Sequence, residues 1–360
     1  MVRLSALRIE NLRNIESTQI EPGPGLNLFI GANGAGKTSL LEAIYLLSHA
    51  HSFRTRRGEL LVRTGQAGAT VFGEIESAAG RRRLGLQQAA GRWSARVDGQ
   101  LVPGLAEAIR HCAVVCFEPG SHALISGASE ERRRFLDWGV FHVEHEFAAI
   151  AGRYRRALRQ RNALLRTGTR PEDLQVWDDA LVAAGLPLSE ARLRYFGRFK
   201  SFAEAQLTAL LPELGAPILK LSSGWGGAED AQATLAASRL VDLQRGHTTR
   251  GPHRSDWKLA FAGAARREYF SRGQEKLCAI ACMLAQAEIY HADHAEWPIM
   301  VLDDLPSELD AAHQTVLLEM LLARAGQVFM SSTELPPALQ ALSAPMRAFH
   351  VEQGRAFVLL

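Results

Sequence analysis

A glycine-rich loop carries the clearest chemical pattern in this sequence of 360 residues. Residues 31–39 read GANGAGKTS and match the phosphate-loop pattern G-x-x-x-x-G-K-[ST] at Gly31, Gly36, Lys37 and Thr38. A turn rich in glycine lets backbone N–H groups point at phosphate oxygens, and the helix that follows aims its positive end at the same anion. The pattern therefore predicts a nucleoside-triphosphate site.

The flanking sequence and the loop residues give this site its expected parts. The apolar run at 26–30 predicts a strand before the loop, and SLLEAIYLL predicts a helix after it. Lys37 is expected to reach the β and γ phosphates and to assist catalysis, and the Thr38 hydroxyl is expected to bind Mg²⁺. The residues expected to contact ATP here are Gly31, Ala32, Asn33, Gly34, Ala35, Gly36, Lys37, Thr38 and Ser39.

A second chemical group ends an apolar run near the C-terminus. Residues 298–304 read PIMVLDD. A parallel strand beside the phosphate-loop strand would deliver Asp303 to the magnesium ion and Asp304, as the catalytic acid, to the attacking water. A solvated strand end has the same composition, so this run is weak evidence by itself. Paired with residues 31–38, it predicts a site that hydrolyses ATP.

A third loop, SRGQ at 271–274, precedes a long helix predicted from about residue 272. It resembles the signature loop of ATP-binding-cassette ATPases, in which a serine hydroxyl and a glycine backbone contact the γ-phosphate held by the opposite subunit. On that resemblance Ser271, Gly273 and Gln274 are further candidates for ATP binding. The alternative is an ordinary serine N-cap, and both interpretations are compatible because a capping geometry also binds anions.

The rest of the chain is predicted to contain both strands and helices. Residues 3–9 predict a strand, joined to the strand at 26–30 by a short connection, and an antiparallel meander is predicted at 69–76, 82–88 and 92–97. Another strand is expected at 112–117. Two helical seams with 3-and-4 spacing follow, at Val143, Phe147, Ile150, Tyr154 and Ala157, and at Leu174, Trp177, Leu181, Ala184, Leu188, Ala191 and Tyr195. They predict two antiparallel helices, the second kinked or broken at Pro187.

Positive charge is concentrated in the middle of the chain, where residues 130–170 hold ten arginines against five acidic residues. Such a stretch suits the phosphates of DNA, which it would bind without reading sequence. The candidates are Arg132, Arg133, Arg134, Arg153, Arg155, Arg156, Arg159 and Arg161. The alternative for each is a solvated helix face, since arginine accounts for most basic residues throughout the chain.

The sequence also indicates the cellular location of the protein and the state of its cysteines. The N-terminus lacks a signal-peptide pattern, and no run approaches the length of a membrane span, so a cytoplasmic protein is expected. The cysteines at 112, 116, 278 and 282 lie in apolar segments with wide spacing, which favours buried free thiols over a zinc site.

The order of these motifs predicts the fold class. A phosphate loop, a helical insertion, a signature loop and an acidic strand follow one another as in an α/β head of the ABC-ATPase type, similar to SMC and Rad50 heads, with a short helical-hairpin arm. We expect an N-terminal ATPase lobe at 1–128, a helical arm at 129–246 and a C-terminal ATPase lobe at 247–360.

Longer stretches resemble the RecF family of bacterial recombination mediators across nearly the whole chain. They are GANGAGKTSLLEAIY from 31, SFRT at 52–55, RRRFLDWGVFH at 132–142, YRRALRQRNALL at 154–165, GPHRSD at 251–256, SRGQEKL at 271–277 and LDDLPSELD at 302–310. The resemblance implies a weak DNA-dependent ATPase that forms an ATP-dependent homodimer. It also implies binding to gapped DNA and to junctions of single and double strands, with partners RecO and RecR, to promote RecA loading.

Three departures from cassette ATPases limit the residue assignments. Position 304 is Asp where most of them carry Glu, no glutamine ends the strand at 112–117, and the switch histidine is missing, with Ser332 or Thr333 nearest its place. Two alternatives follow. A transporter ATPase would need the switch histidine and a membrane partner. A DNA clamp would use ATP only to set dimerisation, with hydrolysis as a slow release step, and Asp304 fits either use.

Overall fold

The computed structural model describes residues 1–168, 170–226, 230–263, 270–324, 326–342 and 345–359. The chain forms two compact units, the first from Met1–Ser121 and Gln286–Leu360, the second from His122–Ala285. This division differs from the boundaries predicted at 128 and 246. The reason is that β10 (Asp256–Phe261) pairs along its length with β9 (Pro217–Ser222) and so belongs with the middle of the chain.

A six-stranded sheet in the order β14-β13-β3-β12-β11-β8 organises the first unit. All neighbours run parallel except the pair β13 and β14. Its strands are β3 (Leu26–Ile30), β8 (Val114–Phe117), β11 (Ile299–Leu302), β12 (Val328–Ser332), β13 (Met346–Glu352) and β14 (Arg355–Val358). The predicted strand at 299–302 is confirmed, but β12 lies between it and β3, so the two are not neighbours. Their carboxyl ends still meet at one edge because the three strands are parallel.

A second sheet of the same unit is antiparallel, in the order β2-β1-β4-β5-β6-β7. Its strands are β1 (Arg3–Leu12), β2 (Ile15–Ile20), β4 (Gly68–Ser77), β5 (Gly80–Ala89), β6 (Arg92–Val97) and β7 (Gln100–Leu101). The predicted meander is confirmed as β4, β5 and β6. The connection expected after β1 instead contains β2. The run IESTQI is too polar to predict a strand, but it forms one because it pairs with β1 in an antiparallel hairpin.

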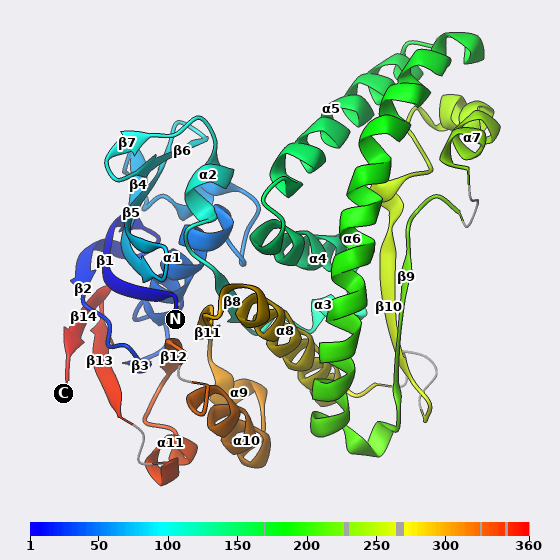
Figure 1. Cartoon of the computed structure of the whole chain (residues 1–360). Helices are drawn as coiled ribbons and strands as arrows, with labels where there is room; N and C mark the ends of the chain where they lie inside the picture. Colours follow the sequence, from blue (N-terminus) through cyan, green and yellow to red (C-terminus); the bar gives the residue numbers. More distant parts are fainter. Residues whose placement is uncertain (169, 227–229, 264–269, 325, 343–344, 360) are drawn as a thin grey trace. The chain divides into compact units, whose positions relative to one another are not determined.

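Helix α1 (Lys37–His49) contacts strands of both sheets in the first unit. Ten of its 13 residues are buried, which explains why the helix is apolar on most sides. The other helical segments of this unit are η1 (Gly58–Leu61), α2 (Leu105–Ile109), α9 (Leu305–Glu308), α10 (Ala311–Leu322) and α11 (Pro337–Leu342). Figure 1 shows α1 beside the strands of the first unit, in the blue part of the chain.

The second unit is mainly helical. Its segments are α3 (Ala123–Ser126), α4 (Ser129–Val143), α5 (Phe147–Arg166), η2 (Pro171–Leu174), α6 (Gln175–Leu210), η3 (Pro212–Leu214), α7 (Ala231–Arg245) and η4 (Pro252–Arg254). Helices α5 and α6 pack against each other (Figure 1). The side chains of the predicted seams are buried there, among them Phe147, Tyr154, Leu181 and Leu188. Helix α6 does not break at Pro187, since one helix runs across it.

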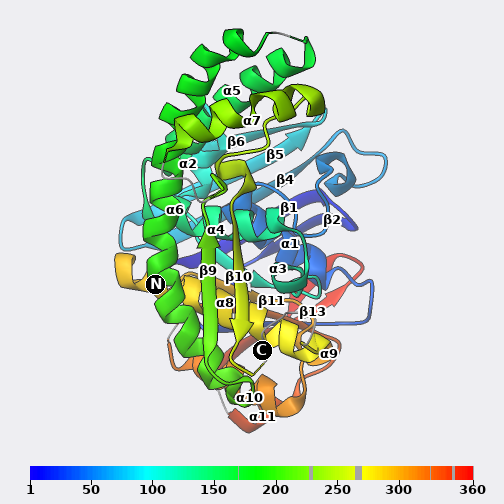
Figure 2. The same ribbon diagram turned by 90° about the vertical axis from the view of Figure 1, so that its right-hand side faces the viewer.

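The ladder of β9 and β10 lies along α6 in this unit (Figure 2). Helix α8 (Arg272–His294) begins in the second unit and continues into the first, and its predicted start near residue 272 is confirmed. In the part of the chain that the structure describes, no helix has both the length and the apolar character needed to cross a membrane.

Candidate nucleotide site

The loop between β3 and α1 is shaped by its glycines. A Cβ on Gly31 would lie 2.2 Å from the carbonyl oxygen of Val351, so no side chain fits there. Gly36 has φ +118°, in the left-handed region that favours glycine, and it immediately precedes the first residue of α1. The first turn of α1 holds no acidic residue, so its positive end faces the loop uncompensated.

Lys37 folds back over this loop. Its Nζ donates to the carbonyl oxygens of Gly31 at 2.6 Å and Ala32 at 3.0 Å. Burial lowers the pKa of Lys37, while the nearby charges of Asp304 and Asp303 act to raise it. The loop therefore holds a largely buried cation whose hydrogen-bond partners, among the residues that the structure describes, are backbone carbonyls, a position that suits a bound anion.

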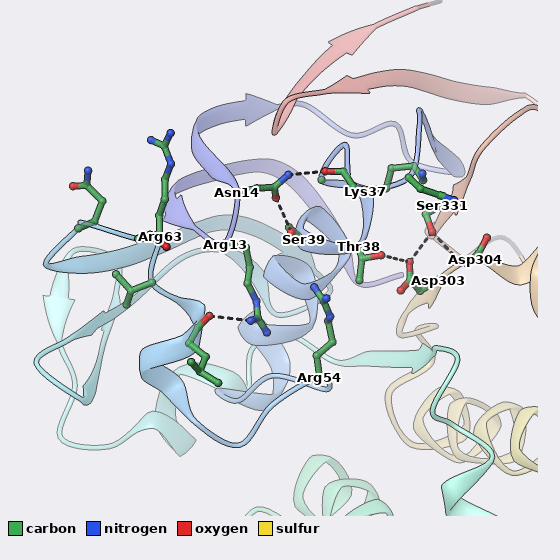
Figure 3. Close-up of a pocket in the computed structure, with 17 residues that line it drawn as sticks. Arg13, Asn14, Lys37, Thr38, Ser39, Arg54, Arg63, Asp303, Asp304 and Ser331 are labelled. Atoms are coloured by element: carbon green, nitrogen blue, oxygen red, sulfur yellow. Dashed lines mark hydrogen bonds between the residues drawn. The ribbon is translucent and has the colours of Figure 1, made fainter.

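The two predicted acids lie at the carboxyl end of β11 and reach the phosphate loop. Thr38 Oγ1 donates to Asp303 Oδ1 at 3.0 Å, and Ser331 Oγ donates to the same oxygen at 2.7 Å (Figure 3). The Asp304 N–H donates to Ser331 Oγ at 2.9 Å. Burial raises the pKa of Asp303, and the hydrogen bonds from Ser331 and Thr38 oppose that shift. The structure thus brings Thr38, Asp303 and Asp304 together as predicted.

A cavity of about 980 Å³ opens over these groups (Figure 3). Among the loop residues, Asn33, Gly34, Gly36, Lys37, Thr38 and Ser39 line it, as do both acids. Three other loop residues use their backbone carbonyls inside the protein. Those of Gly31 and Ala32 accept from Lys37 Nζ, and that of Ala35 accepts the Gly354 N–H at 2.7 Å.

Sequence reasoning missed much of the cavity wall. Asn14, on the turn between β1 and β2, donates to the Gly34 carbonyl at 3.1 Å and accepts from Ser39 Oγ at 3.0 Å. Further lining residues missed are Arg13, Arg54, Leu60, Val62, Arg63, Thr64, Gln66 and Ser331. Of these residues, only Arg54 lies in a stretch that the sequence singles out, the SFRT run at 52–55. The others come from three separate segments of the chain, and no motif in the sequence connects those segments to the phosphate loop.

Two of these arginines share one buried carboxylate. Arg13 binds Glu42 of α1 with both Nε and Nη2, at 2.9 and 2.8 Å, and Ser52 Oγ donates to the same side chain. Arg54 lies 4.0 Å from Glu42, about half exposed, and extends into the cavity (Figure 3). The network fixes the loop at 52–55 to α1 and places the Arg54 guanidinium where it can meet a charged ligand.

Comparisons with known proteins agree with this geometry. Residues 6–76 match the AAA domain family. The chain is 45% identical, over 98% of its length and 99% of the relative, to the DNA replication and repair protein RecF of Stenotrophomonas maltophilia (strain R551-3). It is 34% identical to the RecF of Shewanella loihica (strain ATCC BAA-1088 / PV-4), over 99% of both chains. The chain belongs to the RecF family.

Solved structures support the same assignment. The chain matches the recombination mediator protein RecF of the RecFOR pathway, solved with ATP, at a TM-score of 0.91 and 26% identity, over 100% of this chain and 98% of that one. The fold of an Smc head bound to the C-winged helix domain of ScpA matches at a TM-score of 0.60 and 15% identity, over 99% and 96%. The predicted SMC-like ABC-ATPase head is therefore confirmed, and this RecF-family chain is an ABC-type ATPase.

The donor set of the site suits a hard divalent cation. The hydroxyl of Thr38 and the carboxylate of Asp303 lie together and would offer two oxygen ligands to a small cation such as Mg²⁺. Over the described residues, no group of three or more His, Cys, Asp or Glu could hold a metal alone.

The cysteines are free thiols, and burial raises the pKa of Cys112 and Cys278 to about 12.

The signature loop of this RecF-family chain is closed by its own side chains. Ser271 Oγ accepts the Gln274 N–H at 3.2 Å, and Gln274 Oε1 accepts the Ser271 N–H at 2.9 Å. Gln274 Nε2 also donates to Glu213 Oε1 at 3.3 Å. The helix-cap interpretation is confirmed by this reciprocal box. Contact of Ser271, Gly273 and Gln274 with a nucleotide stays a prediction.

Two of the eight DNA candidates are wrong. Arg161 is fully buried and binds Asp178 at 2.7 Å and Asp242 at 2.8 Å. Arg132 is 7% exposed and binds Asp256 at 2.7 Å. Their guanidinium groups join elements of the second unit, a use that the sequence does not reveal because the partner acids are distant along the chain.

The other six candidates differ in exposure. Arg133 is half-buried and donates to the Ser255 carbonyl at 2.8 Å, and Arg134 pairs with Glu130 at 2.6 Å. The remaining four are exposed on α5, and within the described residues no carboxylate pairs with them: Arg153, Arg155, Arg156 and Arg159. These four, called here the α5 arginines, remain candidates for DNA.

Proposed function

We propose that this RecF-family chain is an ATP-dependent DNA-binding protein of recombinational repair and replication-fork maintenance. It dimerises on ATP, binds gaps and junctions of single- and double-stranded DNA, and helps to load RecA together with RecO and RecR. The relatives named as DNA replication and repair proteins, and the solved RecF of the RecFOR pathway, support this proposal. The observation that carries it is the convergence of Lys37, Thr38, Asp303 and Asp304 on one cavity.

The cavity residues have distinct roles in this proposal. The backbone N–H groups of the phosphate loop and the Lys37 ammonium bind the β and γ phosphates of ATP. Thr38 and Asp303 would hold Mg²⁺, which would supply positive charge to the phosphates. Asp304, with its backbone fixed by Ser331, orients the attacking water and accepts its proton. Hydrolysis is slow and releases DNA.

The signature loop completes the site of a second subunit in this proposal. The N-terminus of α8 and the Ser271 hydroxyl are the groups that would meet a γ-phosphate. Because Ser271 is exposed, it is available to another chain. Dimerisation then depends on ATP, since the phosphate is what the two loops share.

DNA binding is assigned to the α5 arginines. They lie on exposed positions of one helix, and each can meet a phosphate without reading a base. A clamp in which ATP only controls dimerisation remains a second candidate, because a carboxylate as short as Asp304 suits slow turnover. Slow hydrolysis releases DNA in both, and the two differ in whether ATP does anything beyond controlling dimerisation.

The mass of the particle in solution tests the proposed function. Light scattering is run with ATP, with ADP and without nucleotide, each with and without a gapped duplex. A dimer is expected only with ATP, with the duplex bound to that dimer. A monomer in all of these conditions would contradict the proposal.

A pair of charge-matched variants tests the DNA surface. Arg156→Gln with Arg159→Gln should weaken DNA binding and reduce the slope of log affinity against log salt by about one for each phosphate that is no longer neutralised. Lys220→Gln with Lys258→Gln removes the same charge from facing positions of the β9–β10 ladder and should leave the slope unchanged. Equal effects of both pairs would refute the assignment to α5.

A further inference from the structure

One hydroxyl connects the two acids of the nucleotide site. Ser331 Oγ donates to Asp303 Oδ1 at 2.7 Å and accepts the Asp304 N–H at 2.9 Å. Ser331 is 1% exposed, and Phe329 and Met330 before it on β12 are fully buried. A buried hydroxyl costs free energy unless it is hydrogen-bonded, and here its single proton and one lone pair are both used.

The register of the parallel sheet explains why this position reaches both acids. On one side β12 pairs with β3, with Ser331 opposite Phe29. On the other side it pairs with β11, with Met330 opposite Leu302, so the next residues along the two strands, Ser331 and Asp303, come side by side. Ser331 therefore sits between the strand that leads into the phosphate loop and the strand that ends in the acids.

The second hydrogen bond fixes an unusual backbone. Asp304 has φ 53° and ψ 39°, a left-handed conformation that a non-glycine residue holds only when its surroundings enforce it. Its N–H is bound by Ser331, and its carbonyl accepts the Ser307 N–H at 3.0 Å. This turn directs the carboxylates of Asp303 and Asp304 to different sides although they are consecutive residues (Figure 3).

We infer that Ser331 is a positioning residue for ATP hydrolysis. Its hydroxyl holds the Asp303 carboxylate toward Thr38. It also holds the Asp304 backbone so that the Asp304 carboxylate points elsewhere and can orient the attacking water. The inference rests on the proposed function of the site. It assigns a role to the end of β12, where the sequence points only to Ser332 or Thr333 as replacements for a switch histidine.

The test compares Ser331→Ala with Ser48→Ala. Ser48 is also fully buried in the first unit, and its hydroxyl accepts the Val114 N–H at 3.0 Å, so its loss also removes a buried hydrogen bond. Mn²⁺ affinity is measured by EPR with AMP-PNP bound, hydrolysis by phosphate release, and stability by thermal unfolding without nucleotide. Ser331→Ala should weaken Mn²⁺ binding and lower kcat by about 10-fold each, with the KM for ATP changed less than about twofold at saturating Mg²⁺.

Ser48→Ala should lower the unfolding midpoint without changing Mn²⁺ affinity or kcat. Ser331→Thr, which keeps the hydroxyl, should recover most of the Mn²⁺ affinity. Combining Ser331→Ala with Asp303→Asn should weaken Mn²⁺ binding no more than Asp303→Asn does, because the serine acts through that carboxylate. Wild-type values of Mn²⁺ affinity and kcat in Ser331→Ala would overturn the inference. Absence of ATP binding in the wild-type chain would instead reject the proposed function.

Discussion

Two helices of this chain begin at loops of the kind that binds phosphate, and they differ in how their first N–H groups are satisfied. Before α1, Gly36 supplies no side chain, and Lys37 folds over the loop. At α8, Ser271 and Gln274 bond each other, and Glu275 adds a negative charge in the first turn. No side chain caps the start of α1, whereas the start of α8 is capped by side chains of its own loop.

The same contrast separates the arginines of α5. Arg161 has its charge satisfied by two buried carboxylates, while the α5 arginines face solvent. In this second comparison the paired arginine stabilises the fold, and the exposed arginines are available to a ligand. The predictions below test this distinction, from the largest expected effect to the smallest.

Lys37→Arg should abolish most ATP hydrolysis, with a loss of about 100-fold or more. The planar guanidinium keeps the charge, but it does not fit where the ammonium lies 2.6 Å from the Gly31 carbonyl. Phosphate release under saturating ATP is the measurement, with Lys200→Arg on the exposed face of α6 as the control. Turnover within about twofold of wild type would show that the phosphate loop is not the open site described above.

Asp304→Asn should reduce hydrolysis by about 100-fold and leave ATP binding intact, because its carboxylate is needed only for the water. Asp303→Asn should instead weaken Mg²⁺-dependent ATP binding, since Asp303 offers a metal ligand. Fluorescent nucleotide titration with and without Mg²⁺ separates the two variants. If both lose binding equally, the division of roles between the two acids is wrong.

Ser271→Arg should leave ATP binding by the monomer within about twofold of wild type, while hydrolysis falls by about 100-fold and dimers fail to form. A bulky cation at the start of α8 blocks closure on the γ-phosphate of the other subunit. Crosslinking provides the decisive measurement, with cysteines introduced beside Ser271 and Gly34. Crosslinks should join two chains only with ATP, and crosslinks within one chain would leave Ser271 as a helix cap alone.

Arg161→Met should destabilise the folded chain by about 3–5 kcal/mol, because it leaves Asp178 and Asp242 buried with one fewer cation. Arg155→Met, at an exposed position of the same helix, should change stability by less than about 0.5 kcal/mol. Urea unfolding followed by circular dichroism compares them. Similar midpoints for the two variants would remove the distinction between satisfied and open arginines.

Gln274→Ala should have the smallest effect, a loss of about 1 kcal/mol in stability without nucleotide, because half of the capping box is removed. Gln160→Ala, at an exposed position inside α5, is the control and should be neutral. Hydrogen exchange at the first turn of α8 reports the change locally. Unchanged protection there would mean that the box contributes nothing to closing the signature loop.

The sequence by itself determined the elements whose signal is local. The phosphate loop needs consecutive residues of fixed type, so Gly31, Lys37 and Thr38 can be assigned from the sequence pattern alone. The strand at 299–302 and the start of α8 near residue 272 are predicted for the same reason, since an apolar run and a serine cap are each complete within a few positions.

Only the tertiary structure decided which distant groups share a site or a charge. Ser331 reaches Asp303 because β12 lies between β3 and β11, and strand order leaves no trace in an apolar run. Arg161 is unavailable to DNA because acids from α6 and α7 surround it, although it belongs to the same arginine-rich run as its exposed neighbours. Burial and pairing depend on contacts between segments far apart in the chain, and composition along one segment does not encode them.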